Sequence, residues 1–129
     1  MNKFDLNNRT AVITGGAQGF GLDIAKKFIN FGAKVIIWDI DEQQLQKASK
    51  EITSSKLSYN LVDVSNFEQV NNAVLKITSS SNIDILINNA GITGPTSTVW
   101  DYNINEWNKI VQTNLMGTFY CCKSIVPNM

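Results

Sequence analysis

The sequence predicts an α/β fold, a Rossmann-type doubly wound parallel sheet with flanking helices, from three observations. Short apolar runs alternate four times with segments of helical periodicity, as in strands joined by crossover helices. The run Lys34–Asp39 is too continuously apolar for a strand with one solvated face, so helices should cover both faces. A cluster of glycine or polar residues follows each run, where the carboxyl ends of parallel strands bind ligands.

The elements follow from these runs. The predicted strands are Thr10–Thr14, Lys34–Asp39, Ser58–Val64 and Ile83–Ile87. The predicted helices run from the first glycine turn to Gly32, from Asp41 to about Thr53, from Ser65 or Asn66 to about Thr78, and from about Asn105 onward. Phe20, Ile24 and Phe28 recur every four residues, which predicts an apolar face on the first helix.

Composition narrows the class of protein. The chain has 129 residues, which fits one domain, and 43% hydrophobic against 17% charged residues can fill a core. Eleven basic and eleven acidic residues cancel, so the chain shows no charge footprint for nucleic acid or an anionic membrane. No run approaches the ~18 apolar residues of a membrane span. We expect a cytoplasmic protein with no nucleic-acid or membrane partner.

Two residue types limit the chemistry. The absence of histidine excludes Ser-His-Asp and Cys-His catalysis and most zinc sites, so no metal site is predicted. Cys121 and Cys122 are the only cysteines, and a buried apolar pair in a helix is favoured over a redox centre. This cysteine usage fits a reducing compartment.

The segment TGGAQGFG, residues 14–21, lies between the first strand and the first helix. Its glycines keep side chains away from a backbone whose free N–H groups, at the positive end of a helix, can bind a pyrophosphate. It is not a P-loop, because Leu22 follows Gly21 and no Lys-Ser/Thr pair occurs there. The turn therefore predicts a dinucleotide site.

Asp39 ends the second strand, 18 residues after Gly21. The dinucleotide fold places there the carboxylate that accepts hydrogen bonds from the adenosine ribose. The alternative is that Asp39 caps the helix that begins at Asp41.

Four motifs together resemble the short-chain dehydrogenase/reductase family, over the part of the chain from about Phe4 to Met129. They are Thr14-Gly15-x-x-x-Gly19-x-Gly21, Asp63-Val64, Asn88-Asn89-Ala90-Gly91 and Asn114-Leu115. The resemblance implies that residues 1–129 are an NAD(P)-binding Rossmann domain, the amino-terminal half of a reductase. It implies strand order 3-2-1-4 and a sheet that lacks the family's later strands.

The same resemblance implies the roles of the site residues. The cofactor-binding residues are Gly15, Gln18, Gly19, Phe20, Gly21, Asp39, Asp63, Val64, Asn89, Ala90 and Gly91. In the family the Asp after the third strand holds the adenine ring, and Asn-Ala-Gly after the fourth backs the adenine ribose and steadies the sheet. Asn114 is the implied catalytic residue, which holds a water in a proton relay. The alternative is an Asn satisfied locally by backbone.

The family's chemistry also needs a Ser and a Tyr-x-x-x-Lys pair. Tyr59, Tyr102 and Tyr120 are the only tyrosines, and none is followed by lysine four residues later. We therefore expect the 129-residue chain to be inactive by itself, with the carboxyl-terminal half absent. Three classes stay open: an oxidoreductase completed by that half, a dinucleotide-binding module without turnover, and a scaffold that kept the fold.

The resemblance also implies the ligands and partners. NAD is preferred over NADP, because a 2′-phosphate would meet the Asp39 carboxylate and neither Ile40 nor Gln18 offers a positive charge. The substrate is a small carbonyl or secondary alcohol. The stretch from Gly91 to Met129 looks most like 3-oxoacyl-(acyl carrier protein) reductase-like members, with a sugar or polyol dehydrogenase as the alternative. The apolar helix from about Asn105 implies a homodimer or homotetramer of the complete protein.

Overall fold

The computed structural model describes residues 4–129, in which four strands form one parallel sheet in the order β3-β2-β1-β4. The strands are β1 (Thr10–Thr14), β2 (Lys34–Asp39), β3 (Leu57–Leu61) and β4 (Ile85–Ile87). The α-helices are α1 (Gly19–Asn30), α2 (Glu42–Glu51), α3 (Phe67–Thr78), α4 (Ile104–Val111) and α5 (Gly117–Ile125). The predicted fold class and strand order are confirmed.

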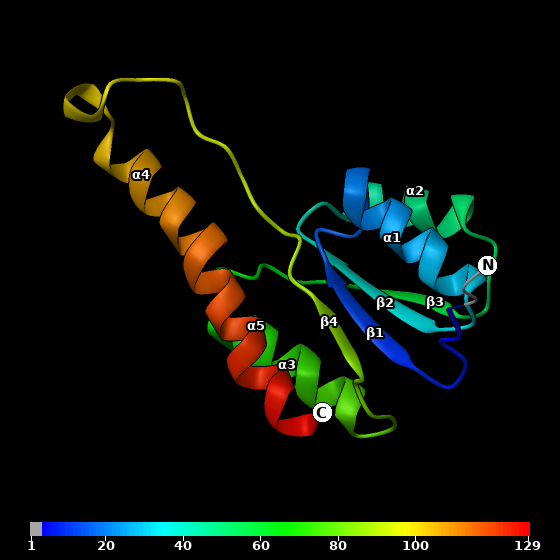
Figure 1. Cartoon of the computed structure of the whole chain (residues 1–129). Helices are drawn as coiled ribbons and strands as arrows, with labels where there is room; N and C mark the ends of the chain where they lie inside the picture. Colours follow the sequence, from blue (N-terminus) through cyan, green and yellow to red (C-terminus); the bar gives the residue numbers. More distant parts are fainter. Residues whose placement is uncertain (1–3) are drawn as a thin grey trace.

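Helices cover both faces of the sheet. α1 and α2 lie on one face and α3 and α5 on the other, while α4 projects away from the sheet as an arm (Figure 1). Alternate residues of a strand point to opposite faces, so Val12 and Trp38 join the core under α3 and α5. Ile13 and Ile37 join the core under α1 and α2. β2 is thus buried on both sides, as its composition predicts.

Both outer strands are shorter than predicted. β3 ends at Leu61 rather than Val64. The N–H of Val62 still donates to the carbonyl of Asp39, the last residue of β2, and the chain then turns at Val64 and Ser65. β4 begins at Ile85 rather than Ile83. Asp84, which was predicted to lie in this strand, instead uses its side chain: the backbone N–H of Thr10 donates to the Asp84 carboxylate at 2.8 Å.

The predicted apolar face of α1 is wrong at its first position. Ile24 and Phe28 pack against the core, but Phe20 is 83% exposed. Phe20 lies in the first turn of α1, beyond the carboxyl end of β1, and belongs to neither core cluster.

Asn side chains cap two of the helices. Of the two caps predicted for α3, Asn66 is the one used, and its Oδ1 accepts from the N–H of Gln69 at 3.1 Å. Asn103 caps α4 in the same way through the N–H of Glu106. α4 therefore begins one residue before the predicted start at Asn105.

The predicted long helix is not continuous. A π-helical turn, Gln112–Met116, joins α4 to α5, and Asn114 lies inside it. A π turn accommodates one extra residue and is frequent at functional sites. A short 3₁₀ turn, Val99–Asp101, forms the tip of the arm.

The cysteine pair is only half buried. Cys121 is fully buried, whereas Cys122 is partly exposed and its Sγ accepts from Asn88 Nδ2 at 3.4 Å. Both thiols are free. Within residues 4–129, His, Cys, Asp and Glu form no group of three or more that could hold a metal ion. No helix in that range has the length and apolarity needed to cross a membrane.

Candidate functional site

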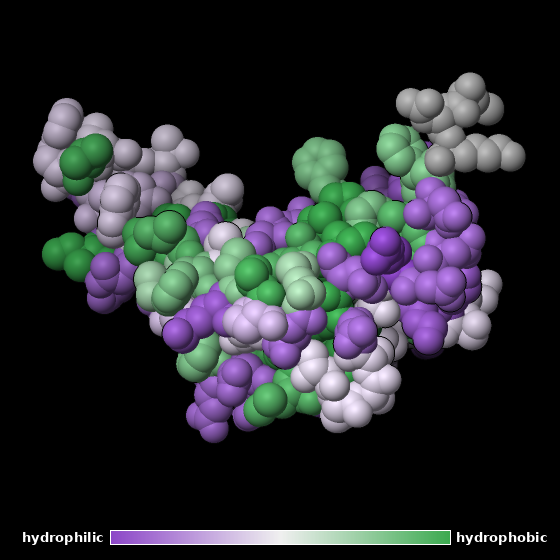
Figure 2. All heavy atoms as spheres, turned by 60° about the horizontal axis from the view of Figure 1, so that its bottom comes forward, coloured by the Kyte–Doolittle hydropathy of each residue, from purple (hydrophilic) through white to green (hydrophobic). Residues whose placement is uncertain are grey.

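A cavity of about 520 Å³ opens at the carboxyl ends of the strands, which is within the range of ligand sites. The space-filling view shows a hollow between the arm and the body of the molecule (Figure 2). Eight of the predicted site residues line the cavity: Gly15, Gln18, Asp39, Asp63, Val64, Asn89, Ala90 and Gly91. The other four predicted residues, Gly19, Phe20, Gly21 and Asn114, lie outside its lining.

Gly21 is required by packing inside the protein. A Cβ at this position would lie 2.3 Å from the carbonyl oxygen of Gly15 and 2.6 Å from Asn89 Nδ2. α1 therefore starts in direct contact with the ends of β1 and β4, a closeness that no side chain permits. Contacts within the chain therefore require glycine at position 21, whether or not a ligand is bound.

Gly19 differs, because a Cβ there would meet no atom within 4 Å, although its φ of +57° favours glycine. The start of α1, next to Gly19, also lacks a side-chain cap. Gln18 makes no side-chain hydrogen bond to the start of α1, and no acidic residue stands in the first turn. The first N–H groups of this 12-residue helix are thus left to bind an anion.

The Asp39 carboxylate joins two loops. Its Oδ2 accepts from the N–H of Ala17 at 3.2 Å, and its Oδ1 accepts from the N–H of Asp41 at 3.1 Å. The cap of α2 is Asp41, whose Oδ1 accepts from the N–H of Gln44 at 3.1 Å. Asp39 is therefore not the helix cap. Each of its oxygens retains a lone pair for a ribose hydroxyl.

Asp63 uses one of its two carboxylate oxygens within the chain. Oδ1 accepts from the N–H of Ser65 at 2.9 Å and from Ser65 Oγ at 2.6 Å. The backbone N–H of Asp63 donates to Gln69 Oε1 at 2.9 Å, which fixes the residue to the first turn of α3. Oδ2 remains an acceptor for an amino group such as that of adenine.

Asn89 ties the end of β4 to the end of β1. Its Nδ2 donates to the carbonyls of Thr14 and Gly15 at 3.1 and 3.0 Å. The backbone N–H groups of Asn89 and Ala90 both donate to Thr14 Oγ1, at 3.1 and 2.9 Å. Because both amide hydrogens are used, the Asn89 side chain holds the sheet in register at the cavity.

Asn114 binds the backbone of the loop after β4. Its Oδ1 accepts from the N–H of Ile92 at 2.8 Å, and its Nδ2 donates to the carbonyl of Ile92 at 2.9 Å. The residue is exposed rather than on a buried face, and its backbone partner lies 22 residues away rather than nearby. The side chain therefore fixes the 91–93 segment, and its role in a proton relay stays a prediction.

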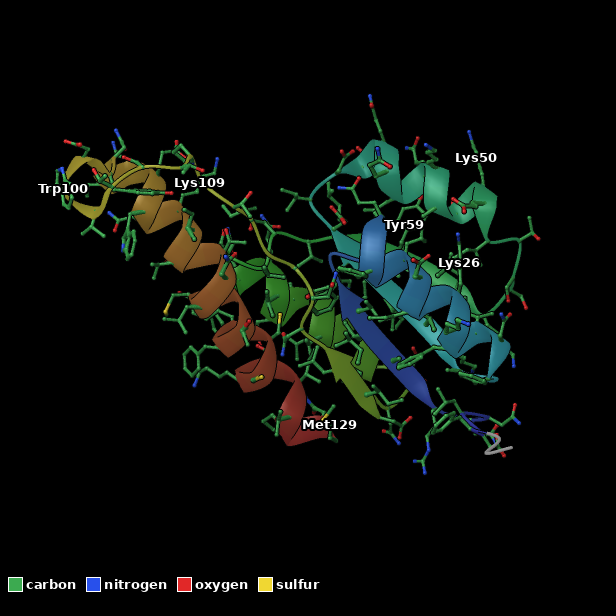
Figure 3. All side chains as sticks on the ribbon, turned by 45° about the horizontal axis from the view of Figure 1, so that its top comes forward. Lys26, Lys50, Tyr59, Trp100, Lys109 and Met129 are labelled. Carbon is green, nitrogen blue, oxygen red and sulfur yellow. The ribbon has the colours of Figure 1, made fainter. Side chains whose placement is uncertain are left out.

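Eight further residues, which the sequence did not predict as site residues, also line the cavity: Ile40, Asp41, Val62, Ser65, Ile92, Lys109, Gln112 and Thr113. Lys109 is the one cation among the described residues of the lining. It lies on α4 between the sheet and the tip of the arm at Trp100 (Figure 3). The spacing of Lys109, Gln112 and Thr113 by three and four residues is the signal that could have placed them on one helix face.

Comparison with known proteins identifies the family. The short chain dehydrogenase family matches residues 9–129. The chain belongs to this family. In its parallel sheet the glycine turn follows β1, and the acidic residue Asp39 ends β2.

Two curated relatives differ in their substrates. A 3-oxoacyl-(acyl-carrier-protein) reductase of Chlamydia muridarum is 38% identical over 128 residues, which cover 96% of this chain and 51% of that protein. An NAD⁺-dependent 2-dehydro-3-deoxy-L-rhamnonate dehydrogenase of Sphingomonas sp. is 35% identical over 122 residues, covering 94% of this chain and 48% of that protein. The chain thus spans about half the length of these relatives.

The structure is similar to that of a 3-ketoacyl-(acyl-carrier-protein) reductase from Brucella melitensis complexed with NADH. The TM-score is 0.90 at 31% identity, over 96% of this chain and 51% of that one. The resemblance to 3-oxoacyl reductases and the Rossmann fold expected from the sequence are both confirmed.

Proposed function

We propose that residues 1–129 form the adenosine side of the cofactor site of an NAD-dependent oxidoreductase. The observation that carries this proposal is the convergence of Asp39, Asp63 and Gln18 on one cavity, because Gln18 directly precedes the open first turn of α1. The two carboxylates supply acceptors for ribose hydroxyls and an adenine amine, and the helix turn supplies donors for a pyrophosphate. A nicotinamide dinucleotide, when bound, accepts or donates a hydride.

NAD fits these residues better than NADP. The 2′-phosphate of NADP would face the Asp39 carboxylate, and like charges in contact disfavour binding. Lys109 is a cation in the same cavity that sequence reasoning did not foresee. It lies on the helical arm, whereas Asp39 lies at the end of β2, beside the glycine turn. Asp39 therefore decides the preference in this proposal.

The proposed substrate is a secondary alcohol or the corresponding ketone, with 3-oxoacyl thioesters as the first candidates. The relative from Chlamydia muridarum and the NADH-bound structure from Brucella melitensis support this choice. A sugar-acid or polyol substrate is the second candidate, favoured by the 35% identity to the rhamnonate-type dehydrogenase.

Binding and turnover should separate in this chain. Reduction of a ketone needs a proton donor at its oxygen as well as a hydride at its carbon. None of the chain's tyrosines has the lysine spacing that the family uses for this proton. We therefore expect residues 1–129 to bind NADH without oxidising it.

Titration of the 129-residue chain with NADH, followed by nicotinamide fluorescence, tests the proposal. Saturable binding that is displaced by AMP supports it, and the absence of binding at millimolar NADH contradicts it. Absorbance at 340 nm with 3-oxoacyl thioesters and polyol-derived ketones tests turnover. Oxidation of NADH by this chain would show that its proton donor is not a Tyr-x-x-x-Lys pair.

A further inference from the structure

Gln112, at the start of the π turn, connects the helix to the loop after β3. Its Nε2 donates to the carbonyl of Ser65 at 3.1 Å and to the hydroxyl of Tyr120 at 3.2 Å. A side-chain amide nitrogen carries two hydrogens, so each of them has an acceptor and the orientation of the side chain is fixed. Gln112 and Ser65 also both line the cavity.

The π turn explains how Gln112 and Tyr120 come together. In a regular α-helix each residue turns about 100°, so residues eight apart stand roughly 80° from alignment. The π turn takes up one extra residue. Gln112 and Tyr120 are therefore related like residues seven apart in an α-helix, which leaves a deviation of only about 20°. The extra residue places both side chains over the same loop.

The helix touches this loop at two further points. A Cβ on Gly117 would lie 2.7 Å from Val64 Cγ2, so the helix backbone rests directly on Val64. The ring of Tyr120 lies 5.4 Å from the ring of Phe67, the first residue of α3. The segment from residue 64 to residue 67 is thus held along its length by one helix.

Hydrogen bonds connect Gln112 through Ser65 to Asp63, the residue predicted to bind adenine. Gln112 holds the carbonyl of Ser65, and the N–H and Oγ of Ser65 both donate to Asp63 Oδ1. Any displacement of Ser65 therefore moves the Asp63 carboxylate directly. No other side chain from α4 or the π turn donates to this loop in the part of the chain that the structure describes.

We propose that Gln112 is a positioning residue for the adenine end of the cofactor site. It acts through Ser65, by keeping the Asp63 carboxylate and the Val64 backbone where an adenine ring is recognised. This inference rests on the proposed function, since it presupposes that the cavity takes an adenine nucleotide. It adds a specific dependence, because the pyrophosphate end at α1 does not depend on Gln112.

The test compares two probes in the full 129-residue chain. AMP carries the adenine, while inorganic pyrophosphate carries only the anion, and both are measured by displacement of NADH. We expect Gln112→Ala to weaken AMP binding about three- to tenfold, as for the loss of one or two hydrogen bonds, and to leave pyrophosphate binding unchanged. Asn108→Ala removes an exposed amide from the same helix outside the cavity and should change neither.

Two conservative variants protect the test against misfolding. Gln112→Glu keeps the size but cannot donate to Ser65 and adds a negative charge near Asp63, so it should weaken AMP binding at least as much as alanine does. Tyr120→Phe removes only the hydroxyl that accepts from Gln112. The ring still packs against Phe67 and Gln112 still donates to Ser65, so AMP binding should weaken less than in Gln112→Ala. Thermal unfolding of each variant reports any general loss of structure.

The outcomes separate the possibilities. AMP binding by Gln112→Ala within twofold of the unsubstituted chain would overturn the assignment. A parallel loss of AMP and pyrophosphate affinity together with a lower unfolding temperature would also overturn it, as a purely structural role. Failure of the unsubstituted chain to bind NADH and AMP would instead overturn the proposed function, and this inference with it.

Discussion

The backbone N–H of Ala17 donates to the Asp39 carboxylate at 3.2 Å, which joins the glycine turn after β1 to the end of β2. This bond fixes the carboxylate at the wall of the cavity that also contains Gly15 and Gln18. A cofactor ribose seated beside the glycine turn would therefore meet a side chain whose direction is already set. Such pre-organisation lets one charge decide between two closely related cofactors.

The first prediction concerns that choice. We expect NAD to bind ten- to a hundredfold more tightly than NADP, about 1.5–3 kcal/mol, because NADP loses a charged hydrogen bond and gains a like-charge contact. Asp39→Asn keeps an acceptor for Ala17 but removes the charge, so the preference should fall to within about threefold. Calorimetric titration with both cofactors measures the difference.

Asp41→Asn is the matched control, because Asp41 lines the same cavity and an asparagine can still cap α2. It should leave the preference for NAD unchanged. Equal or tighter binding of NADP by the unsubstituted chain would contradict the prediction.

The second prediction separates the roles of two glycines. Gly21→Ala places a methyl group 2.3 Å from the Gly15 carbonyl, and overpacking of this kind costs about 1–3 kcal/mol of unfolding free energy or more. Gly19→Ala meets no atom within 4 Å, so its cost should be limited to the positive φ, about 1–2 kcal/mol. Urea unfolding followed by tryptophan fluorescence measures both.

Pyrophosphate affinity gives the complementary result. Gly19→Ala puts a methyl group into the open space beside the first turn of α1, so it should weaken pyrophosphate binding more than its effect on stability suggests. If Gly19→Ala binds pyrophosphate as the unsubstituted chain does, the open space at Gly19 is not part of an anion site.

Sequence patterns predicted what depends on local periodicity and strand ends. The apolar runs located β1 and β2 to the residue. The rule that ligands bind at the carboxyl ends of parallel strands predicts that Asp39, Asp63 and Ala90 lie together, and all three line the cavity. The outer strands were less well predicted, because their ends depend on contacts with neighbouring segments, such as the bond from the N–H of Thr10 to the Asp84 carboxylate just before β4.

The remaining features depend on contacts between segments far apart in the chain. The π turn adds a single residue to a helix. Apolar residues at spacings of three and four are compatible with a helix with or without this extra residue, so the sequence does not reveal the turn. The pairing of Asn114 with Ile92 and the contact of Gly21 with Asn89 need the folded geometry. Residue type alone made all four glycines of the turn look alike.

The third prediction concerns the buried thiol. Burial raises the pKa of Cys121 to about 12 from its usual 9.0, with a smaller contribution from Cys122. The folded state therefore keeps a proton that the unfolded chain releases above pH 9. The resulting stabilisation is fully present below pH 9 and is lost as the pH rises toward 12, by about 1.4 kcal/mol per pH unit at most.

Cys121→Ala isolates this effect from the titration of other groups. The difference in unfolding free energy between the unsubstituted chain and the variant should shrink from pH 9 upward, as measured by urea unfolding at several pH values. A thiol reagent at pH 8 gives an independent check. In Cys122→Ala the native chain should take up no label until denaturant is added, and rapid labelling would show that Cys121 is accessible.

The fourth prediction concerns self-association through the outer face of α4, the π turn and α5. The exposed apolar side chains there are Ile104, Trp107, Leu115 and Phe119, which are 75%, 53%, 64% and 52% exposed. The extra residue of the π turn keeps Trp107 and Leu115 nearly aligned, so these side chains form one stripe. A continuous apolar surface of this kind marks an interface with another protein.

We expect a second copy of the chain to cover this stripe, so that light scattering at micromolar concentration reports a dimer or a larger symmetric assembly. Leu115→Glu would place a charge in the middle of the interface and should raise the dissociation constant at least a hundredfold, about 3 kcal/mol. Leu75→Glu is the matched control, because Leu75 is a similarly exposed leucine, 60% exposed, on a different helix, α3. It should leave the assembly intact. A monomeric unsubstituted chain, or equal dissociation by both variants, would contradict an interface at this face.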